Sequence, residues 1–218
     1  MTLTWAPNGQ ATDVEIKQTD KLYNGHYELN RYQLRHKTFE GRWGGWIVRE
    51  HLLRRDATAV LLYDPIRDAV VLVEQFRVGP LHRQDAATPW LLEIPAGLND
   101  HPDPAQVGIK EVKEETGLTI QKMIPIGQYY TTPGGFSEKM HLFCALIASE
   151  EAQGIHGLAD EGEEIKVVVL SFEEIWTLLG NGLVTSSSTY IALQWLALNR
   201  TRLREDESCQ AGSKPHPT

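Results

Sequence analysis

The chain has 218 residues, of which 41% are hydrophobic and 23% charged, the composition of an ordinary globular protein with room for one large domain and an appendage. Its 21 basic and 29 acidic residues give a formal net charge of −8, which argues against nucleic acid or an anionic membrane as a partner, since either would want a basic surface. No apolar run is as long as a membrane span, the N-terminus lacks the pattern of a signal peptide, and the two cysteines make no disulfide framework, so we expect a cytoplasmic protein.

The N-terminal region has the pattern of a sheet. Residues 13–53 alternate polar and apolar positions, and turn signals stand at Asn24-Gly25 and Glu40-Gly41. This alternation predicts antiparallel strands. By domain, we expect residues 1–55 to form an N-terminal sheet region, residues 56–204 the main domain, and residues 205–218 a disordered tail.

The main domain begins with two apolar runs, residues 57–63 and 69–77, which flank the turn signal DPIRD. They predict a hairpin that is buried on both faces. Further strands are predicted at WLLEIPA, TIQKMIPIGQYY, KMHLFCALIA and IKVVVL. Two helices follow: Ser171 and Glu174 form a capping-box start for the first, and the second runs from about Ser188 to Leu203.

Between these strands lies an acidic segment, GLNDHPDPAQVGIKEVKEETGL, residues 97–118. Asp103 suits the N-cap of a short helix, and Gly117 suits its left-handed end. Glu111 and Glu115 are one turn apart on the same face of this helix. That face lies beside the stripe that is expected to face the core, which is formed by Ala105, Ile109, Val112 and Thr116. Two carboxylates and a carbonyl from the preceding strand are ligands that Mg²⁺ prefers, although a solvated surface is the commoner reading of a glutamate-rich helix.

The spacing of the whole segment favours the metal site. It resembles the Nudix box, Gly-x5-Glu-x7-Arg-Glu-U-x-Glu-Glu-x-Gly-U with U aliphatic, from Gly97 through Glu111 to Leu118. Three positions depart from the box: Lys110 replaces the arginine, Asp103 stands near the first glutamate, and the loop before the helix is one residue short. Lysine supplies the charge of arginine without its planar fork, so the helix carboxylates are oriented less firmly.

The resemblance extends to WLLEIPAG, TTPGGFSEK and GIHGLADEGEEIKV, which look like the bacterial ADP-ribose pyrophosphatase branch of the Nudix family. It implies an α/β fold (of the α+β kind), an α/β/α sandwich with a mixed sheet preceded by the N-terminal antiparallel sheet. It also implies a homodimer whose N-terminal sheets exchange, so that both chains build each site and the sheet region serves both dimerisation and substrate binding.

The activity implied by the resemblance is Mg²⁺-dependent hydrolysis of ADP-ribose to AMP and ribose 5-phosphate, with roughly two or three ions per site and Mn²⁺ as a possible substitute. The implied metal ligands are Glu111, Glu115 and Glu163 with the main-chain oxygen of Ala96, and Glu114 is a secondary candidate. Glu161 matches the catalytic base. The roles of Glu161 and Glu163 could be exchanged, because both lie in one loop.

The resemblance also implies a set of substrate contacts, because adenine needs an aromatic or guanidinium face and phosphates need arginine. Arg54 and Arg55 could trade places in this set, and Arg49 or Arg54 could instead pair across strands with Glu28 or Glu50. Trp43 and Trp46 are expected to pack the dimer or the hairpin rather than the base. The implied contacts are His26, Tyr27, Arg49, Glu50, Arg54, Arg77, Leu98, Thr132, Pro133, Gly134 and Glu138.

Two other functions remain open at this point. The same scaffold could cleave another nucleoside-diphosphate sugar, such as ADP-glucose or GDP-mannose. Alternatively, the chain could be a catalytically silent sensor of ADP-ribose, which the four glutamates Glu111, Glu115, Glu161 and Glu163 argue against.

Overall fold

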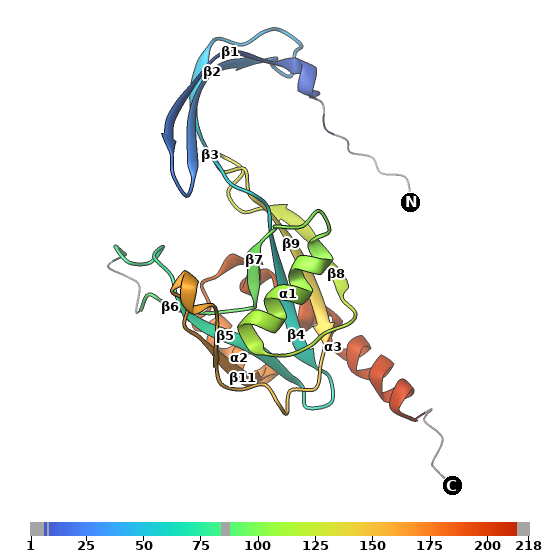
Figure 1. Ribbon diagram of the computed structural model, residues 1–218. Helices are drawn as coiled ribbons and strands as arrows, with labels where there is room; N and C mark the ends of the chain where they lie inside the picture. Colours follow the sequence, from blue (N-terminus) through green and yellow to red (C-terminus); the bar gives the residue numbers. More distant parts are fainter. Residues whose placement is uncertain (1–6, 8, 84–87, 213–218) are drawn as a thin grey trace. The chain divides into compact units, whose positions relative to one another are not determined.

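The computed structural model describes residues 7, 9–83 and 88–212, with side chains described to residue 205 except that of Glu161. The chain divides into two compact units (Figure 1). The N-terminal unit comprises Met1–Arg55 and Tyr130–Glu138, and the sandwich unit comprises Asp56–Tyr129 and Lys139–Thr218. No helix in the described part of the chain is long and apolar enough to cross a membrane.

The N-terminal unit is built on a three-stranded sheet in the order β1-β2-β3, preceded by the short 3-10 helix η1 (Ala11–Asp13). β1 (Val14–Asn24) pairs antiparallel with β2 (Glu28–His36), and β2 pairs antiparallel with β3 (Ile47–Leu53). The strands therefore confirm the antiparallel sheet that the alternating sequence predicts, with a turn after Asn24. The segment 130–138 joins this unit through backbone hydrogen bonds between Leu52 and residues Gly135 and Ser137.

The sandwich unit contains an eight-stranded sheet in which β10, β11, β5, β4, β9 and β8 follow one another, while β6 pairs with β5 and β7 with β4. β4 and β9 are parallel, and the other registered pairs of this sheet are antiparallel, so the expected mixed sheet is confirmed. The strands are β4 (Ala57–Asp64), β5 (Ala69–Phe76), β6 (Trp90–Glu93), β7 (Ala96–Leu98), β8 (Ile124–Tyr130), β9 (Lys139–Leu146), β10 (Ile155–His156) and β11 (Ile165–Ser171).

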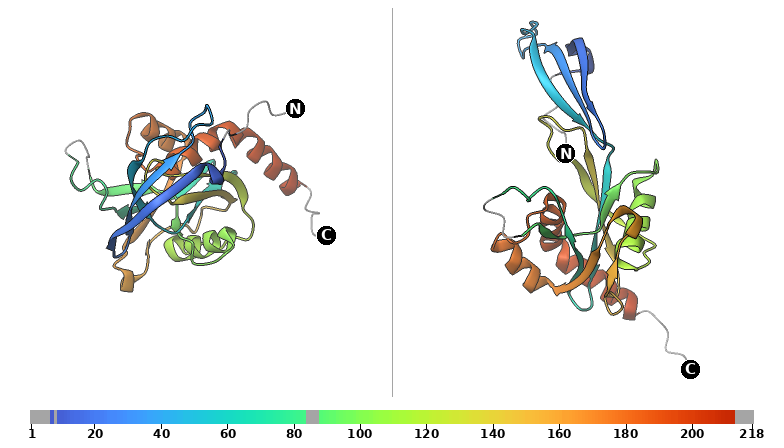
Figure 2. Two further views of the ribbon diagram at one scale, coloured as in Figure 1. Left: turned by 90° about the horizontal axis from the view of Figure 1, so that it is seen from above. Right: turned by 60° about the vertical axis from the view of Figure 1, so that its left-hand side comes forward.

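Helices cover both faces of this sheet, with α1 (Pro104–Thr116) on one side and α2 (Phe172–Gly180) and α3 (Ser187–Gly212) on the other (Figure 2). Ser171 and Glu174 form the predicted capping box at the start of α2. α3 continues past Leu203, where the helix was expected to end, to Gly212. The disorder expected of the tail stays a prediction, and residues 213–218 lie outside the described residues.

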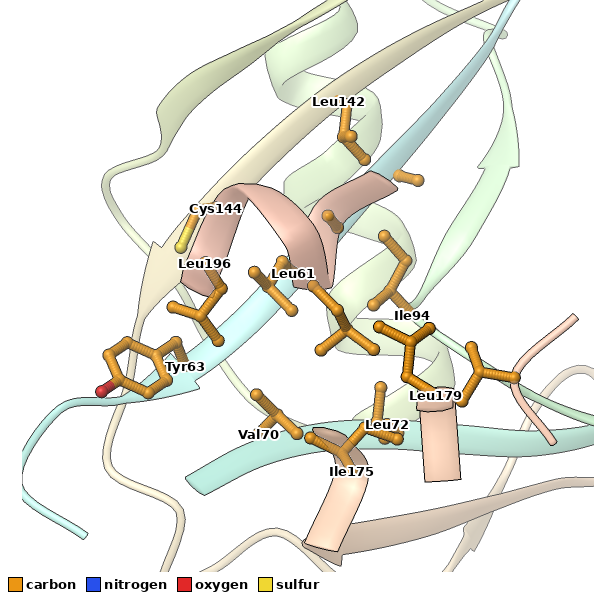
Figure 3. Close-up of a cluster of buried hydrophobic side chains, with 14 of the residues drawn as sticks. Leu61, Tyr63, Val70, Leu72, Ile94, Leu142, Cys144, Ile175, Leu179 and Leu196 are labelled. Carbon is orange, nitrogen blue, oxygen red and sulfur yellow. The ribbon is translucent and has the colours of Figure 1, made fainter. Parts of the chain in front are cut away.

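Two hydrophobic clusters hold the layers together. On the side of α2 and α3, strand residues such as Leu61 and Leu72 point toward Ile175, Leu179 and Leu196 of the helices (Figure 3). On the side of α1, apolar strand residues pack against that helix in a second cluster, and α1 is thereby fixed against the sheet. Every residue of β4 is buried and β5 nearly so, which confirms the predicted hairpin with two covered faces.

Candidate active site

Helix α1 carries the acidic site and has a defined start and end. The side chain of Asp103 accepts a hydrogen bond from the backbone N–H of Ala105 at 2.9 Å, and Pro104 is the first helical residue. Gly117 ends the helix in the left-handed conformation at a φ of 72°. The expected caps are therefore present. They fix which residues of the acidic segment face the sheet.

Glu111 lies directly against the backbone that enters the helix. A Cβ atom built on Gly97 would meet the Glu111 Cδ at 2.1 Å, so this contact requires a glycine at position 97 while Glu111 stays where it is. Glu111 is half-buried, and one turn later Glu115 is only 3% exposed. Glu115 accepts a hydrogen bond from the backbone N–H of Ala96 at 3.2 Å. Both carboxylates thus lie beside the strand end at Ala96 and Gly97.

The inward face of α1 differs in part from the expected stripe. Val112 and Thr116 are buried as expected, whereas Ala105 and Ile109 are only half-buried. The face is turned so that Glu115 belongs to the buried side. A glutamate at a core-facing position is costly unless something compensates its charge.

The electrostatics of the two carboxylates show this cost. Burial, and next the charges of Glu114 and Glu163, raise the pKa of Glu111 to about 7, against the opposing effect of Lys110. Burial raises the pKa of Glu115 well above its usual value; Glu111 and Glu163 add to this, while the Ala96 N–H and Arg77 oppose it. The site therefore concentrates carboxylates, and the positively charged side chains around them do not balance their negative charge.

The loop after β10 contributes a third carboxylate. The backbone N–H of Gly157 donates to the carbonyl of Glu114 at 3.3 Å, which ties this loop to the end of α1. Glu161 lies in the short 3-10 helix η2 (Ala159–Glu161), and Gly162 then turns the chain at a φ of 71° so that Glu163 follows. Glu163 is half-buried and acts electrostatically on both helix carboxylates. The side chain of Glu161 lies outside the described residues.

This donor set fits a hard divalent cation that keeps part of its shell for water and substrate. Where side chains are described, no three His, Cys, Asp or Glu residues form a complete metal cage. Mg²⁺ typically uses one or two carboxylates and completes its shell with water and substrate phosphate. Glu111, Glu115 and the carbonyl of Ala96 offer oxygen donors of this kind, and Glu163 acts electrostatically on both glutamates. Glu114 is the poorer candidate, since it is on the side of Lys110, whose Nζ lies 3.8 Å from its carboxylate.

In the N-terminal unit, four of the residues implied to contact substrate lie together. An Arg54 Nη1 lies 3.2 Å from the carboxylate of Glu138, and the Arg54 guanidinium lies 5.2 Å from the ring centre of Tyr27. The ring of His26 meets Tyr27 edge-on, with 4.9 Å between centroids. Ser137 bonds to both the N–H and the C=O of Arg54 and so fixes its backbone. Arg54 is thus half-buried while Arg55 is exposed.

The cross-strand alternatives for the arginines are not observed. Glu28 pairs with Lys21 and Glu50 with Arg31, at 2.6 and 3.4 Å, rather than with Arg49 or Arg54. Arg49 is exposed and donates to the neighbouring carbonyl of Val48. Thr132, Pro133 and Gly134 form an exposed turn, and Leu98 is half-buried on β7.

Trp43 and Trp46 pack against basic side chains of their own unit. The guanidinium of Arg35 lies 4.8 Å from the ring centre of Trp43 and 4.7 Å from that of Trp46. Lys37 and Lys17 lie over the same rings at 5.6 Å. Two indoles around one guanidinium stabilise the sheet by cation–π attraction.

Comparison with known proteins places this arrangement in a family. The family model described as "NUDIX domain" matches residues 53–190, which include the strand end at Ala96, helix α1 and the loop of Glu163. The chain belongs to the NUDIX family. The resemblance of the acidic segment to the Nudix box is thereby confirmed, with Lys110 in place of the arginine. Lys110 pairs with Asp100 at 2.8 Å, so it ties the loop before the helix to the helix itself.

Relatives of this NUDIX protein include ADP-ribose pyrophosphatases and a GDP-mannose pyrophosphatase. An ADP-ribose pyrophosphatase of Haemophilus influenzae is 39% identical over 195 residues, covering 88% of this chain and 90% of the relative. The ADP-ribose pyrophosphatase of Escherichia coli K12 is 37% identical, covering 89% and 92%. A GDP-mannose pyrophosphatase of Yersinia pestis is 30% identical over 186 residues, covering 85% and 92%.

A solved structure described as an ADP compounds hydrolase shares the fold, with a TM-score of 0.64 and 19% identity over 90% of this chain and 99% of the other. The α/β/α sandwich that the sequence predicts is therefore confirmed as a NUDIX fold.

Two polar residues of this NUDIX fold were missed by sequence reasoning. Glu93 ends β6, and its carboxylate lies 2.7 Å from the Nε of Arg77. Gln75 is 4% exposed, and its Nε2 has no hydrogen-bond partner among the described residues. The available signal was a polar residue near the end of a mostly apolar strand, Glu93 in WLLE and Gln75 in AVVLVEQF. Such residues need a hydrogen-bond partner when they are buried.

Proposed function

We propose that this protein hydrolyses the diphosphate of ADP-ribose to AMP and ribose 5-phosphate with the help of Mg²⁺. The observation that carries the proposal is the pair Glu111 and Glu115, held against the strand end at Ala96 and Gly97 with raised pKa values. Buried carboxylates without enough positive charge are costly, and a divalent cation removes that cost. The names of the Haemophilus influenzae and Escherichia coli relatives, both ADP-ribose pyrophosphatases, support the substrate.

The residues that would hold the metal are Glu111, Glu115 and Glu163 with the carbonyl of Ala96. When bound, a divalent cation neutralises the diphosphate and makes hydroxide available near neutral pH. The helix carboxylates are already ordered by the caps of α1 and by the Ala96 N–H, so their geometry does not have to form during the reaction. Roughly two or three ions would fit the chemistry of such a site.

Glu161 is proposed as the general base. In the reaction, a water oxygen forms a bond to phosphorus, its proton passes to the Glu161 carboxylate, and the bridging P–O bond of the diphosphate breaks. Gly162 follows Glu161 in the left-handed conformation, and such a turn lets the base sit in a short loop beside the ligand Glu163. The half-buried position of Glu163, and its effect on both helix carboxylates, support its assignment as the ligand.

The two roles are separated by measuring rate against Mg²⁺ concentration. Glu161→Gln should lose turnover while the Mg²⁺ concentration for half-maximal rate stays the same, because a proton acceptor used only in the transition state is removed. Glu163→Gln should raise that concentration, because a ground-state ligand is removed. A Mg²⁺ defect in Glu161→Gln together with a pure turnover defect in Glu163→Gln would mean that the roles are reversed.

Residues of the N-terminal unit support the substrate. In the sandwich unit, Arg77 and Leu98 are further proposed contacts. Tyr27 and Arg54 offer an aromatic and a guanidinium face for a base. The remaining proposed contacts are His26, Arg49, Glu50, Thr132, Pro133, Gly134 and Glu138. GDP-mannose is a second candidate substrate, because the Yersinia pestis relative carries that name.

A panel of nucleoside-diphosphate sugars with identification of the products decides between the candidates. We expect kcat/KM to be highest for ADP-ribose, with AMP and ribose 5-phosphate as products and no turnover in excess EDTA. A higher kcat/KM for GDP-mannose or ADP-glucose would replace the proposed substrate. Binding of ADP-ribose without any turnover would support the sensor instead.

We also propose a homodimer in which N-terminal sheets are exchanged between chains. Ile16, Leu34 and Ile47 share one row across β1, β2 and β3, and Ile16 is 57% exposed in the single chain. An apolar row on a thin sheet is typical of a surface that a partner covers. A cytoplasmic location suits the free, buried Cys144.

A further inference from the structure

The ion pair between Arg77 and Glu93 joins two strand ends next to the acidic site. The Nε of Arg77 donates to the carboxylate of Glu93 at 2.7 Å. The Glu93 side chain is 12% exposed and that of Arg77 is 41% exposed, so the carboxylate is the fixed partner and the guanidinium reaches outward. Arg77 is also held through its backbone, because its N–H donates to the carbonyl of Pro89 at 2.8 Å.

The register of the sheet places Glu93 on the face that α1 covers. Glu93 lies directly opposite Val73 on the neighbouring strand, so the two side chains share a face. Val73 is two residues after Val71, which packs in the cluster that contains Val112 of α1. Glu93 therefore points to the side of the sheet where Glu115 lies. Three residues later the same segment reaches Ala96, the backbone partner of Glu115.

Arg77 acts on this site electrostatically. Its positive charge lowers the pKa of Glu115 in opposition to burial. An arginine whose charge acts on a buried carboxylate would ordinarily pair with it, because a guanidinium and a carboxylate form strong bidentate hydrogen bonds. In that arrangement the arginine would neutralise the groups that are needed for a cation. Glu93 offers a competing carboxylate, which takes the Nε edge of the guanidinium.

We propose that Glu93 is a positioning residue: it holds Arg77 by its Nε so that the outer nitrogens of the guanidinium face the diphosphate of the substrate instead of the carboxylates of α1. This inference rests on the proposed function for the identity of the substrate. Glu93 itself touches no reacting atom. It acts through Arg77, and any effect of changing it should disappear when Arg77 is absent.

A double-mutant cycle tests this dependence. Glu93→Ala should raise the KM for ADP-ribose about tenfold, the scale of losing a hydrogen bond to a charged group, and should leave kcat much less changed because an oriented phosphate contact is made in both ground and transition states. Glu93→Gln should be the milder variant, since its amide oxygen still accepts from the Nε. In an Arg77→Ala background, Glu93→Ala should have no further effect on KM.

The matched control is Glu74 of β5, the residue that follows Val73, the strand partner of Glu93. Glu74 pairs with Lys166 at 3.1 Å across the same sheet, and Glu74→Ala removes an ion pair without touching Arg77. We expect its KM to equal that of the wild type. If Glu93→Ala raises KM equally with and without Arg77, or if Glu93→Ala behaves like Glu74→Ala, the positioning role is wrong.

A direct readout separates this inference from the proposed function. The ¹⁵Nε–H signal of Arg77, assigned by its loss in Arg77→Lys, should be shifted in the wild type and protected from solvent exchange, and Glu93→Ala should abolish that protection. This measurement needs no turnover, so it remains decisive if the wild type hydrolyses none of the nucleoside-diphosphate sugars. An unchanged Nε–H signal in Glu93→Ala would overturn the inference even if ADP-ribose is the substrate.

Discussion

The two sheets of this protein differ in how they are stabilised. Every residue of β4 in the sandwich unit is buried, whereas no residue of β1 in the N-terminal unit is. β4 lies between two hydrophobic clusters, one formed with α1 and the other with α2 and α3. The sheet of β1, β2 and β3 has ion pairs and cation–π contacts on its surface instead, such as Arg35 between Trp43 and Trp46.

The sandwich unit therefore buries its own apolar surface, whereas the N-terminal unit cannot do so alone. Exposed ion pairs contribute little to stability, with a median of about 0–1 kcal/mol. A thin sheet of three strands needs an apolar face packed on something to be stable. The proposed exchange between two chains would supply that packing. The well-packed sandwich unit can also tolerate the free-energy cost of concentrating carboxylates on helix α1.

The largest expected effect contrasts core positions in the two units. Leu61→Ala should lower the free energy of unfolding by about 2–5 kcal/mol, because Leu61 is fully buried and the change leaves a cavity. Ile16→Ala, at a position that is 57% exposed in the single chain, should weaken the proposed dimer with much less effect on the sandwich unit. Denaturant unfolding and sedimentation at several concentrations measure both. Equal losses of stability in the two variants would contradict the comparison.

The second prediction contrasts buried and exposed carboxylates. Glu115→Gln should reduce kcat by at least ~100-fold, the scale of one strong electrostatic contribution to catalysis. When EDTA removes divalent cations, the Tm of this variant should not be lower than that of the wild type, because the amide replaces a charge that burial makes costly. Glu28→Gln in the N-terminal sheet, which breaks the pair with Lys21, serves as the control and should leave kcat unchanged. Near-normal turnover of Glu115→Gln would exclude the metal site.

The third prediction concerns the close approach at Gly97. Gly97→Ala should displace the Glu111 carboxylate, because the new Cβ would lie 2.1 Å from the present position of its Cδ. We expect kcat/KM to fall about tenfold while stability changes little, since the end of a glutamate side chain can move aside. Gly127→Ala on β8, where a Cβ would meet nothing within 4 Å, is the control. Wild-type kcat/KM in Gly97→Ala would show that the contact has no role.

The smallest expected effect is on pH dependence. Burial raises the pKa of Asp68, but hydrogen bonds from Arg200 and Tyr63 outweigh it and keep that pKa below its usual value. The stabilisation is therefore present above the unfolded pKa and is lost as pH falls through the folded pKa. Asp68→Asn should cost about 1 kcal/mol at neutral pH, and its difference from the wild type should shrink toward about pH 3.

The control for this change is Asp13→Asn in the N-terminal unit. Asp13 also has a lowered pKa, from its hydrogen bonds with Lys37 and the Gln10 backbone, but its side chain is more exposed than that of Asp68, at 24% against 17%. Its replacement should change stability less than Asp68→Asn does, as measured by denaturant unfolding at both pH values. A difference that grows as pH falls would contradict the assignment to Asp68.

Local features of the sequence were sufficient to predict several elements. The cap at Asp103, the left-handed end at Gly117 and the spacing of Glu111 and Glu115 define helix α1 because each depends on residues within a few positions of one another. The capping box of α2 is equally local. The end of α3 was placed too early, since a polar sequence carries no strong stop signal of its own.

Which distant residues meet depends on tertiary packing. Local spacing was enough to show that two carboxylates stand one turn apart, and with the family pattern it indicated a metal site. It did not reveal that Glu115 is buried against the Ala96 N–H, or that Glu93 holds Arg77. These contacts depend on the register of β5 with β6 and on the packing of α1 against the sheet. Such pairings are long-range, and no periodicity of 2 or 3.6 residues encodes which strand a given strand will meet.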